Sequence, residues 1–433
     1  METVRDAKPL LRERGRAAAP RRPSRPQRPA RRLKRILDLE DFERAVRPRL
    51  PRAVYGYVAH GSETETALRG NRAAFDAWRL VSRVLVGVED RAQDVTLLGR
   101  RYAAPFGIAP MGGAALVAYQ GHTVMAKAAA RANIPFILSA NSIIPLEEVA
   151  AANPNAWFAA YQSPNQAAIE GMVERVARAG IAVLVVTADV PVGSNREFDA
   201  RAGFGFPIRP GPRLAWDVLT HPRWLGAVLG RTLLRRRLNP HIDNLEPTGG
   251  PGLFSREVAG IAAHEQLSWD HIRRMRELWR GPLVVKGILS PADVALAREY
   301  GLDGVILSNH GGRQLDHAVA PLAILPAALE QAGGMTVMID SGFRRGTDVV
   351  KALALGAAAV FVGRPFLFAA AYAGEAGVAH AIALLARELD KDMAMLGVRR
   401  INEIGRGALI PSLATFRSGA VGAGETVSRV GDW

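Results

Sequence analysis

From about residue 100 onward, the chain repeats one pattern of apolar and polar positions. A short apolar run is followed by a polar or glycine-containing turn, and then by a segment with helical periodicity. The runs are rich in Val, Ile and Phe, a composition that favours strands over buried helix segments. Eight such runs occur, at Phe106–Ala109, Phe136–Leu138, Trp157–Ala160, Ala182–Val186, Leu283–Val285, Val305–Leu307, Val337–Ile339 and Ala359–Val362.

Segments with the period of an amphipathic helix lie between most of these runs. Examples are Gln166–Ala179, Pro291–Tyr300 and Thr347–Leu355, and two further helices are expected earlier, over Asp38–Arg49 and Pro51–His60. Eight apolar strands alternating with helices predict an α/β protein with a (β/α)8 TIM barrel. A doubly wound open sheet is the alternative, because it has the same alternation.

One interval between strands is much longer than the others. Nearly a hundred residues separate Val186 from Leu283, and they predict an insertion over about residues 200–265. Within it, Leu214–Leu238 combines Trp216 and Trp224 with several leucines and arginines. An apolar, Trp-bearing and Arg-rich helix is typical of a membrane surface. A helix packed on the barrel with a basic outer face explains the same pattern equally well.

Charge is concentrated at the N-terminus. The net charge is +15, and residues 1–35 hold 13 Lys and Arg against three Asp and Glu. We expect this tail to be disordered, because Arg, Ala and Pro bury little apolar surface, and we expect residues 36–433 to form the barrel domain. A solvated tail is favoured over a transit peptide or a contact with nucleic acid or lipid. No secretory signal and no apolar run of about 18 residues is present, so we expect a cytoplasmic protein without a transmembrane helix or a nucleic-acid partner.

The chain contains no cysteine. Disulfides, thiolate nucleophiles and cysteine-ligated metals are therefore excluded, and we expect no metal site. Redox chemistry would have to come from a bound cofactor.

Residues suited to binding and catalysis collect where the expected strands end. Because the carboxyl ends of barrel strands form the active face, these residues should meet at one mouth. In chain order they are Pro110, Ser139, Tyr161, Thr187 with Asp189, Lys286, Ser308 to His310, Asp340, and Gly363 with Arg364.

The last two strand ends indicate a phosphate site. Asp340–Gly346 and Gly363–Pro365 are glycine-containing turns that carry arginines. Loops after strands seven and eight of such barrels frequently bind phosphate. Glycine lets backbone N–H groups close on the oxygens, and a guanidinium grips them with two hydrogen bonds.

The sixth strand end supplies a candidate base. His310 can accept a proton near neutral pH, and Asp189 could orient its ring. Arg313 and Arg196 could hold a carboxylate between them. Lys286 follows an apolar strand and needs an anion, either a bound ligand or a salt bridge across the barrel mouth.

Three stretches, Ser308–Asp316, Asp340–Gly346 and Gly363–Pro365, resemble the signatures of the FMN-dependent L-2-hydroxy-acid oxidases and dehydrogenases. The resemblance runs from about Leu37 to about Ile410, and Asp217–Trp224 is most similar to the (S)-mandelate dehydrogenase group. It implies FMN as cofactor, oxidation of a mandelate- or lactate-like L-2-hydroxy acid to the 2-keto acid, and a homo-oligomer, typically a tetramer.

The resemblance also implies a role for each matching residue. His310, Asp189 and Tyr161 would be catalytic, and Tyr57, Arg196, Arg313 and Tyr161 would bind substrate. The flavin ring would contact Pro110, Met111, Gly112, Ser139, Thr187, Lys286 and Ser308, while the ribityl phosphate would contact Asp340, Gly342, Arg344, Gly363 and Arg364. The chain departs from the family at Ala159, where a flavin-binding glutamine is usual, and at Met111, where a smaller or polar residue is common.

We expect a quinone-type acceptor for the electrons, with the enzyme peripheral to the inner face of a membrane. Three alternatives fit the sequence less well. They are an oxidase that uses oxygen, a phosphate-binding isomerase or lyase barrel without flavin, and a non-catalytic descendant that binds flavin or a partner.

Overall fold

A computed structural model describes residues 31–161, 163–204, 211–255 and 265–412. Its centre is a closed parallel barrel with strand order β4-β11-β10-β9-β8-β7-β6-β5, and a bridge between Ile108 and Phe136 joins the two ends of that order. This confirms the predicted TIM barrel and excludes the open sheet. The strands are β4 (Phe106–Ile108), β5 (Ile137–Ser139), β6 (Trp157–Ala160), β7 (Val183–Thr187), β8 (Leu283–Ile288), β9 (Gly304–Leu307), β10 (Thr336–Ile339) and β11 (Ala359–Val362).

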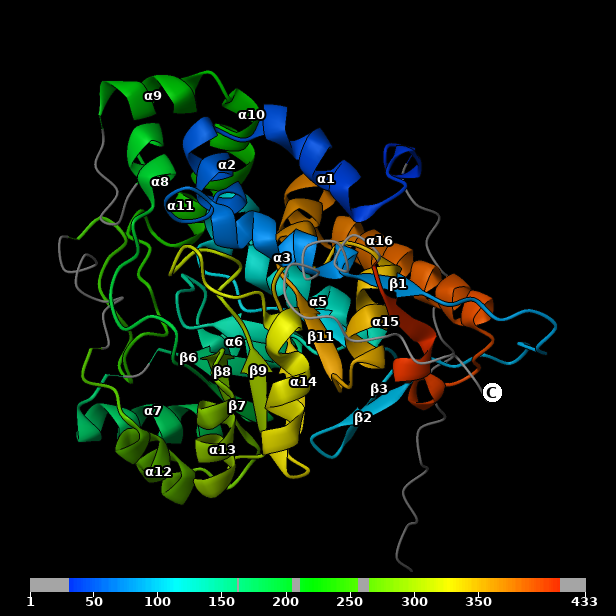
Figure 1. Cartoon of the computed structure of the whole chain (residues 1–433). Helices are drawn as coiled ribbons and strands as arrows, with labels where there is room; N and C mark the ends of the chain where they lie inside the picture. The colour runs from blue at the N-terminus through cyan, green and yellow to red at the C-terminus, as the bar shows by residue number, and fades with distance from the viewer. Residues whose placement is uncertain (1–30, 162, 205–210, 256–264, 413–433) are drawn as a thin grey trace, which may run out of the picture.

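Helices surround the barrel, and each covers the apolar outer face of the strands beside it (Figure 1). Asn165 caps α7 by accepting a hydrogen bond from the backbone N–H of Ala168, and Pro291 begins α13. The surrounding helices are α4 (Ala114–Val117), α5 (Gly121–Ala132), α6 (Leu146–Ala152), α7 (Gln166–Arg178), α12 (Trp269–Leu278), α13 (Pro291–Glu299), α14 (Pro321–Ala332), α15 (Gly346–Ala354) and α16 (Arg364–Leu396).

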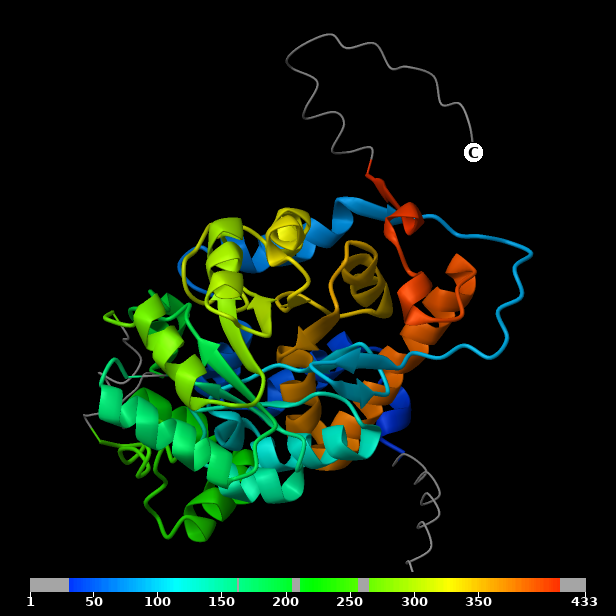
Figure 2. The same ribbon diagram turned by 90° about the horizontal axis from the view of Figure 1, so that it is seen from below.

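The barrel interior is filled with side chains, so it is a core and not a channel. Alternate strand residues such as Trp157, Val185, Ile306 and Phe361 point inward and form one apolar cluster. The hairpin β2 (Val95–Leu97) and β3 (Arg100–Tyr102) lies across the amino-terminal end of the barrel (Figure 2). There the Trp157 indole N–H donates to the Tyr102 hydroxyl at 3.0 Å. Because the hairpin covers the amino-terminal end of the barrel, we expect the ligand site at the carboxyl ends of the strands.

The N-terminal segment packs across the outside of the barrel. Asp38 caps α1 (Leu39–Val46) in a reciprocal capping box with Asp41, and α2 (Arg52–Ala59) and α3 (Thr66–Asp76) follow. The short helices η1 (Leu33–Arg35) and η2 (Arg47–Arg49) flank α1. Since Leu33 is buried in the core, packing begins a few residues before the predicted boundary at residue 35. Residues 1–30 of the predicted tail lie outside the described part.

The predicted insertion contains several short helices instead of one long one. These are α8 (Glu197–Ala202), α9 (Pro212–Leu219), α10 (Pro222–Trp224), the π-helical turn η3 (Leu225–Gly230) and α11 (Arg231–Arg235). Pro222 explains the break after α9, because proline cannot continue a hydrogen-bonded helix. The insertion helices gather beside α2 at the mouth of the barrel (Figure 1).

The described part of the chain ends with helix α16 and a small sheet. Strand β12 (Leu409–Pro411) pairs with β1 (Trp78–Leu80), and the helices η5 (Ile401–Glu403) and η6 (Arg406–Ala408) precede it. Within the described residues, α16 is the one helix long and apolar enough to span a membrane, but 56% of its apolar window is buried. Non-helical backbone at Ala373 and Gly374 also kinks it, so it is a packing helix of the barrel.

Candidate active site

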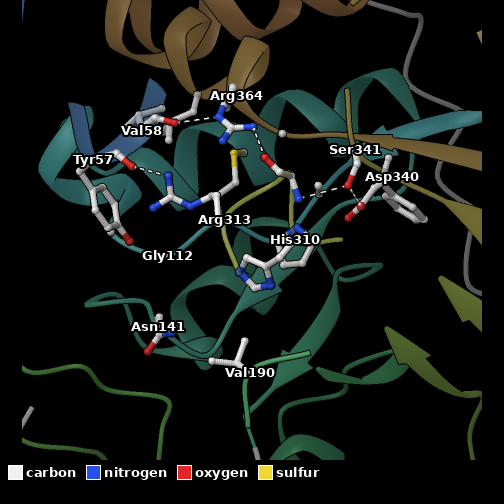
Figure 3. Close-up of a pocket in the computed structure, with 18 of the residues that line it drawn as sticks. Tyr57, Val58, Gly112, Asn141, Val190, His310, Arg313, Asp340, Ser341 and Arg364 are labelled. Atoms are coloured by element: carbon white, nitrogen blue, oxygen red, sulfur yellow. Dashed lines mark hydrogen bonds between the residues drawn. The ribbon is translucent and has the colours of Figure 1, made fainter. Parts of the chain in front are cut away.

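A cavity of about 240 Å³ opens at the carboxyl ends of the strands. Most of the predicted site residues line it, and Figure 3 shows several of them around the opening. The lining includes Tyr57, Pro110, Met111, Gly112, Tyr161, Arg196, Lys286, His310, Arg313, Asp340, Gly342, Arg344, Gly363 and Arg364. Four predicted residues, Ser139, Thr187, Asp189 and Ser308, lie behind this lining as buried or half-buried groups at the strand ends.

His310 and Asp189 form the pair expected of a general base. The His310 Nδ1 lies 2.9 Å from an Asp189 carboxylate oxygen. Because a carboxylate only accepts, the shared hydrogen resides on Nδ1, which leaves Nε2 free to accept a proton. Burial lowers the pKa of His310, although Asp189 raises it in part. The imidazole is therefore neutral at pH 7.

The backbone around His310 is shaped for this position. His310, Gly311 and Gly312 all have positive φ angles, which is uncommon for histidine and typical of a functional loop. A Cβ atom on Gly311 would lie 2.9 Å from the Arg364 guanidinium. On the neighbouring strand, a Cβ on Gly287 would lie 2.5 Å from the Asp189 carboxyl carbon. Glycine at these two positions lets the base and the arginine approach closely.

Lys286 lies at the centre of the strand ends. Its ammonium contacts Asp340 at 3.1 Å, Ser308 at 2.8 Å and Asp189 at 4.0 Å. Burial lowers the pKa of Lys286, but the two carboxylates outweigh it and raise the pKa. Burial likewise raises the pKa of Asp189, while His310 and Lys286 outweigh it and lower the pKa. Lys286 is therefore a fixed positive charge. It links Asp340 and Asp189 across the barrel mouth and also lines the cavity.

Three half-buried arginines face the same cavity. Arg313 donates to the carbonyl oxygens of Tyr57 and His60, at 2.6 and 2.8 Å. Arg364 donates to the carbonyls of Val58 and Gly311, at 2.8 and 3.0 Å (Figure 3), and Arg344 donates to its own neighbour Phe343. Within the described ranges, none of the three is ion-paired with a carboxylate within 4 Å.

The positive charges of these arginines repel one another, and this repulsion favours the binding of anions in the cavity. Burial and Arg196 lower the pKa of Arg313 to about 10, and burial with Arg313 and Arg344 lowers the pKa of Arg364 to about 9. Burial also lowers the pKa of Arg344. All three remain charged at neutral pH, so a bound carboxylate and a bound phosphate would relieve an unfavourable buried charge.

The strand ends fit the FMN that the resemblance implies. Thr187 Oγ1 is buried without a hydrogen-bond partner among the described residues, and its strand register places it beside Lys286. Together they offer a donor and a charge to the polar edge of a flavin. Ala159, paired with Ser139 and Val185, offers no side-chain hydrogen bond at that position, so the strand lacks the family's glutamine contact.

Several residues at the cavity were not singled out from the sequence. Asn141 faces the cavity two residues after β5, and Ser341, within the predicted Asp340–Gly346 turn, donates to Asp340 at 2.8 Å. Ile242 and Leu253 reach the cavity from the insertion, which strand-end reasoning could not foresee. His122 is buried behind the cavity, where its Nε2 lies 2.8 Å from the Met111 carbonyl oxygen. Burial lowers the pKa of His122 to about 4, so a neutral ring supports the Met111 loop.

Comparisons with known proteins agree with this geometry. Residues 46–411 match the FMN-dependent dehydrogenase family. The chain is 37% identical over 374 residues to an L-lactate dehydrogenase of Stenotrophomonas maltophilia, covering 84% of this chain and 96% of that protein. It is 38% identical over 359 residues to the (S)-mandelate dehydrogenase of Pseudomonas putida, covering 82% and 89%.

The fold comparison gives the same result. A crystal structure of the monotopic membrane protein (S)-mandelate dehydrogenase superposes with a TM-score of 0.81 at 35% identity, covering 87% of this chain and 99% of the other. A mandelate oxidase structure superposes with a TM-score of 0.71 at 32% identity, covering 87% and 99%. Because the family match spans most of the chain and includes the strand ends that build the cavity, this protein belongs to the FMN-dependent dehydrogenase family.

Proposed function

We propose that this enzyme oxidises an L-2-hydroxy acid to the 2-keto acid at this cavity, with His310 as the base. The observation that carries the proposal is the convergence of the His310–Asp189 pair and the two guanidiniums of Arg196 and Arg313 on one opening. Family membership supports an FMN-dependent oxidation and does not support the flavin-free isomerase or lyase alternative.

Each residue has a separate task in this proposal. Arg313 and Arg196 bind the substrate carboxylate, since both face the cavity and have neutral hydrogen-bond partners only, such as Gln314 at 3.0 Å from Arg196. His310 Nε2 then accepts a proton from the substrate, while Asp189 stabilises the resulting imidazolium. Tyr161 lines the cavity, and burial raises its pKa, so its hydroxyl stays protonated as a donor. FMN, when bound, supplies the two-electron oxidation.

The phosphate of FMN would lie at the part of the cavity lined by Arg344 and Arg364. Arg344 and Arg364 face it, and Ser341 and Gly342 add a turn with positive φ angles between them. Lys286 and Thr187 would hold the polar edge of the ring. This division leaves His310 and Arg313 for the substrate.

Anaerobic mixing tests the proposed reaction directly. Addition of L-mandelate or L-lactate to the FMN-bound protein should reduce the flavin and bleach its absorbance near 450 nm, while the D enantiomers serve as the control. If no 2-hydroxy acid bleaches the flavin, the proposal is wrong.

The pH dependence of kcat/KM should report the neutral state of His310. Because burial lowers its pKa, the base form persists below the ordinary value of about 6.5, and activity should fall only at lower pH. In Asp189→Asn, the acid limb should move to still lower pH, because Asp189 raises the pKa of His310. An acid limb above pH 7 in the native enzyme would contradict the assignment of His310 as base.

We also propose that the insertion lies on the inner face of a membrane and that a quinone accepts the electrons. Trp216, Leu219 and Leu234 expose 62–75% of their surface around α9 and α11, beside exposed arginines such as Arg223 and Arg235. Apolar anchors within a basic surface suit anionic lipid headgroups. The similarity to a protein described as monotopic supports this position.

Vesicle flotation tests the membrane contact. Binding to anionic vesicles should weaken by about tenfold or more in Trp216→Ser/Leu219→Ser. The variant lacks the two apolar side chains whose transfer from water into the membrane favours binding. Met395→Ser is the matched control, since Met395 is equally exposed at the end of α16. Equal binding by both variants would contradict the proposal. Peroxide release during turnover in air would indicate the oxygen-using alternative.

A further inference from the structure

A second cavity lies directly beside the active-site cavity. It measures about 120 Å³, and Leu116 and Leu253 line both cavities. The two leucines therefore form a shared wall. Leu253 comes from the insertion and Leu116 from α4, so the second cavity lies between the barrel and the helices of the insertion.

The lining of this second cavity is entirely apolar. Val54, Phe204, Val218 and Leu229 are among its ten residues, and each of the ten is aliphatic or aromatic. Trp224 carries the one polar side-chain group, and its indole N–H already donates to the Leu116 carbonyl at 3.0 Å. The cavity thus suits a hydrocarbon chain. It does not suit a quinone head, whose carbonyls need hydrogen-bond donors.

The wall that the two cavities share is part of the apolar lining of the active-site cavity. Ile143, Val190 and Ile242 line the active-site cavity together with the two shared leucines. A 2-hydroxy acid whose carboxylate is held by Arg196 and Arg313 has its side chain left to contact apolar walls. For a substrate side chain to extend from one cavity into the other, the buried side chains of Leu116 and Leu253 must change rotamer.

We propose that the second cavity is a tail pocket for the aliphatic chain of the substrate. The enzyme then prefers L-2-hydroxy acids with medium or long chains over lactate. This inference rests on the proposed function, and it names the substrate class of the same site. The exposed apolar residues of α9 and α11, next to the pocket, would admit an amphiphilic acid from a lipid surface.

A chain-length series in the reductive half-reaction tests the tail pocket. Anaerobic stopped-flow with L-2-hydroxy acids from three to ten carbons should show the apparent Kd falling by about fourfold per added CH2 until the pocket is filled. No acceptor is present in this experiment, so a quinone cannot contribute. A Kd that is flat or rises with chain length overturns the tail pocket, whereas absence of bleaching by every acid overturns the proposed function itself.

Filling the pocket provides the matched variant. Val218 and Leu229 line only the second cavity, so Val218→Phe or Leu229→Phe should leave reduction by L-lactate unchanged. Reduction by L-lactate also shows that the variant has folded. The gain in affinity from longer chains should be lost in both variants. If the chain-length series is unaffected and only reoxidation by a quinone is slowed, the pocket belongs to the acceptor and the inference is wrong.

Discussion

Replacement of His310 by glutamine should slow flavin reduction by L-2-hydroxy acids by about 10²–10⁴-fold, the range that a positioned general base contributes. Glutamine retains a hydrogen-bonding amide near Asp189 but cannot accept the substrate proton at neutral pH. Stopped-flow absorbance at 450 nm gives the rate constant at saturating substrate.

The variant should keep its FMN, because His310 lies on the substrate side of the cavity in this account. The FMN content after dialysis is therefore the control. A rate constant within threefold of the native value would show that the proton goes to another group. Loss of FMN would instead show that the ring supports the cofactor.

Removal of the two guanidiniums assigned to the phosphate should release the cofactor. In Arg344→Met/Arg364→Met, the affinity for FMN should fall by about 10²–10⁴-fold, because each hydrogen bond to a charged group contributes about 1.5–3 kcal/mol. Fluorescence titration of the apoprotein with FMN measures the change. The double variant is expected to fold, because neither guanidinium is ion-paired with a carboxylate among the described residues and both have backbone carbonyls as their hydrogen-bond partners.

Arg345→Met is the matched control for that double variant. Arg345 is adjacent to Arg344 in sequence, but its guanidinium pairs with Glu388 at 2.9 Å and is half-exposed. FMN affinity should be unchanged in this control. If Arg345→Met weakens FMN as much as the double variant does, the phosphate site has been assigned to the wrong side of the turn.

The barrel could be predicted because its signal is local. Buried parallel strands are continuous apolar runs, and all eight predicted runs coincide with barrel strands to within a few residues. The predicted run Leu283–Val285 is shorter than the observed strand β8, which continues to Ile288. Its pairing with β9 persists through a register shift between Lys286 and Ile288. Polar or flexible residues in a strand end are not readable from apolar periodicity alone.

Contacts between distant segments could not be predicted in the same way. Ile242 and Leu253 enter the cavity from the insertion, and His122 supports the Met111 loop from α5. No pattern of residue spacing in the sequence predicts either contact, because each depends on how helices and loops pack on the barrel. The sequence predicted one helix over Leu214–Leu238, whereas Pro222 breaks it. The direction of the following turn depends on tertiary contacts, such as the hydrogen bond from Trp224 to the Leu116 carbonyl.

The assigned roles of the site residues can be tested together in one experiment, a crystal structure of the FMN enzyme with a bound 2-keto acid. The account predicts the FMN phosphate within hydrogen-bonding distance of Arg344 and Arg364. It also predicts the carboxylate between Arg196 and Arg313, with His310 Nε2 facing the keto oxygen. A phosphate bound away from those two arginines, or a carboxylate on the opposite side of the flavin from His310, would contradict it.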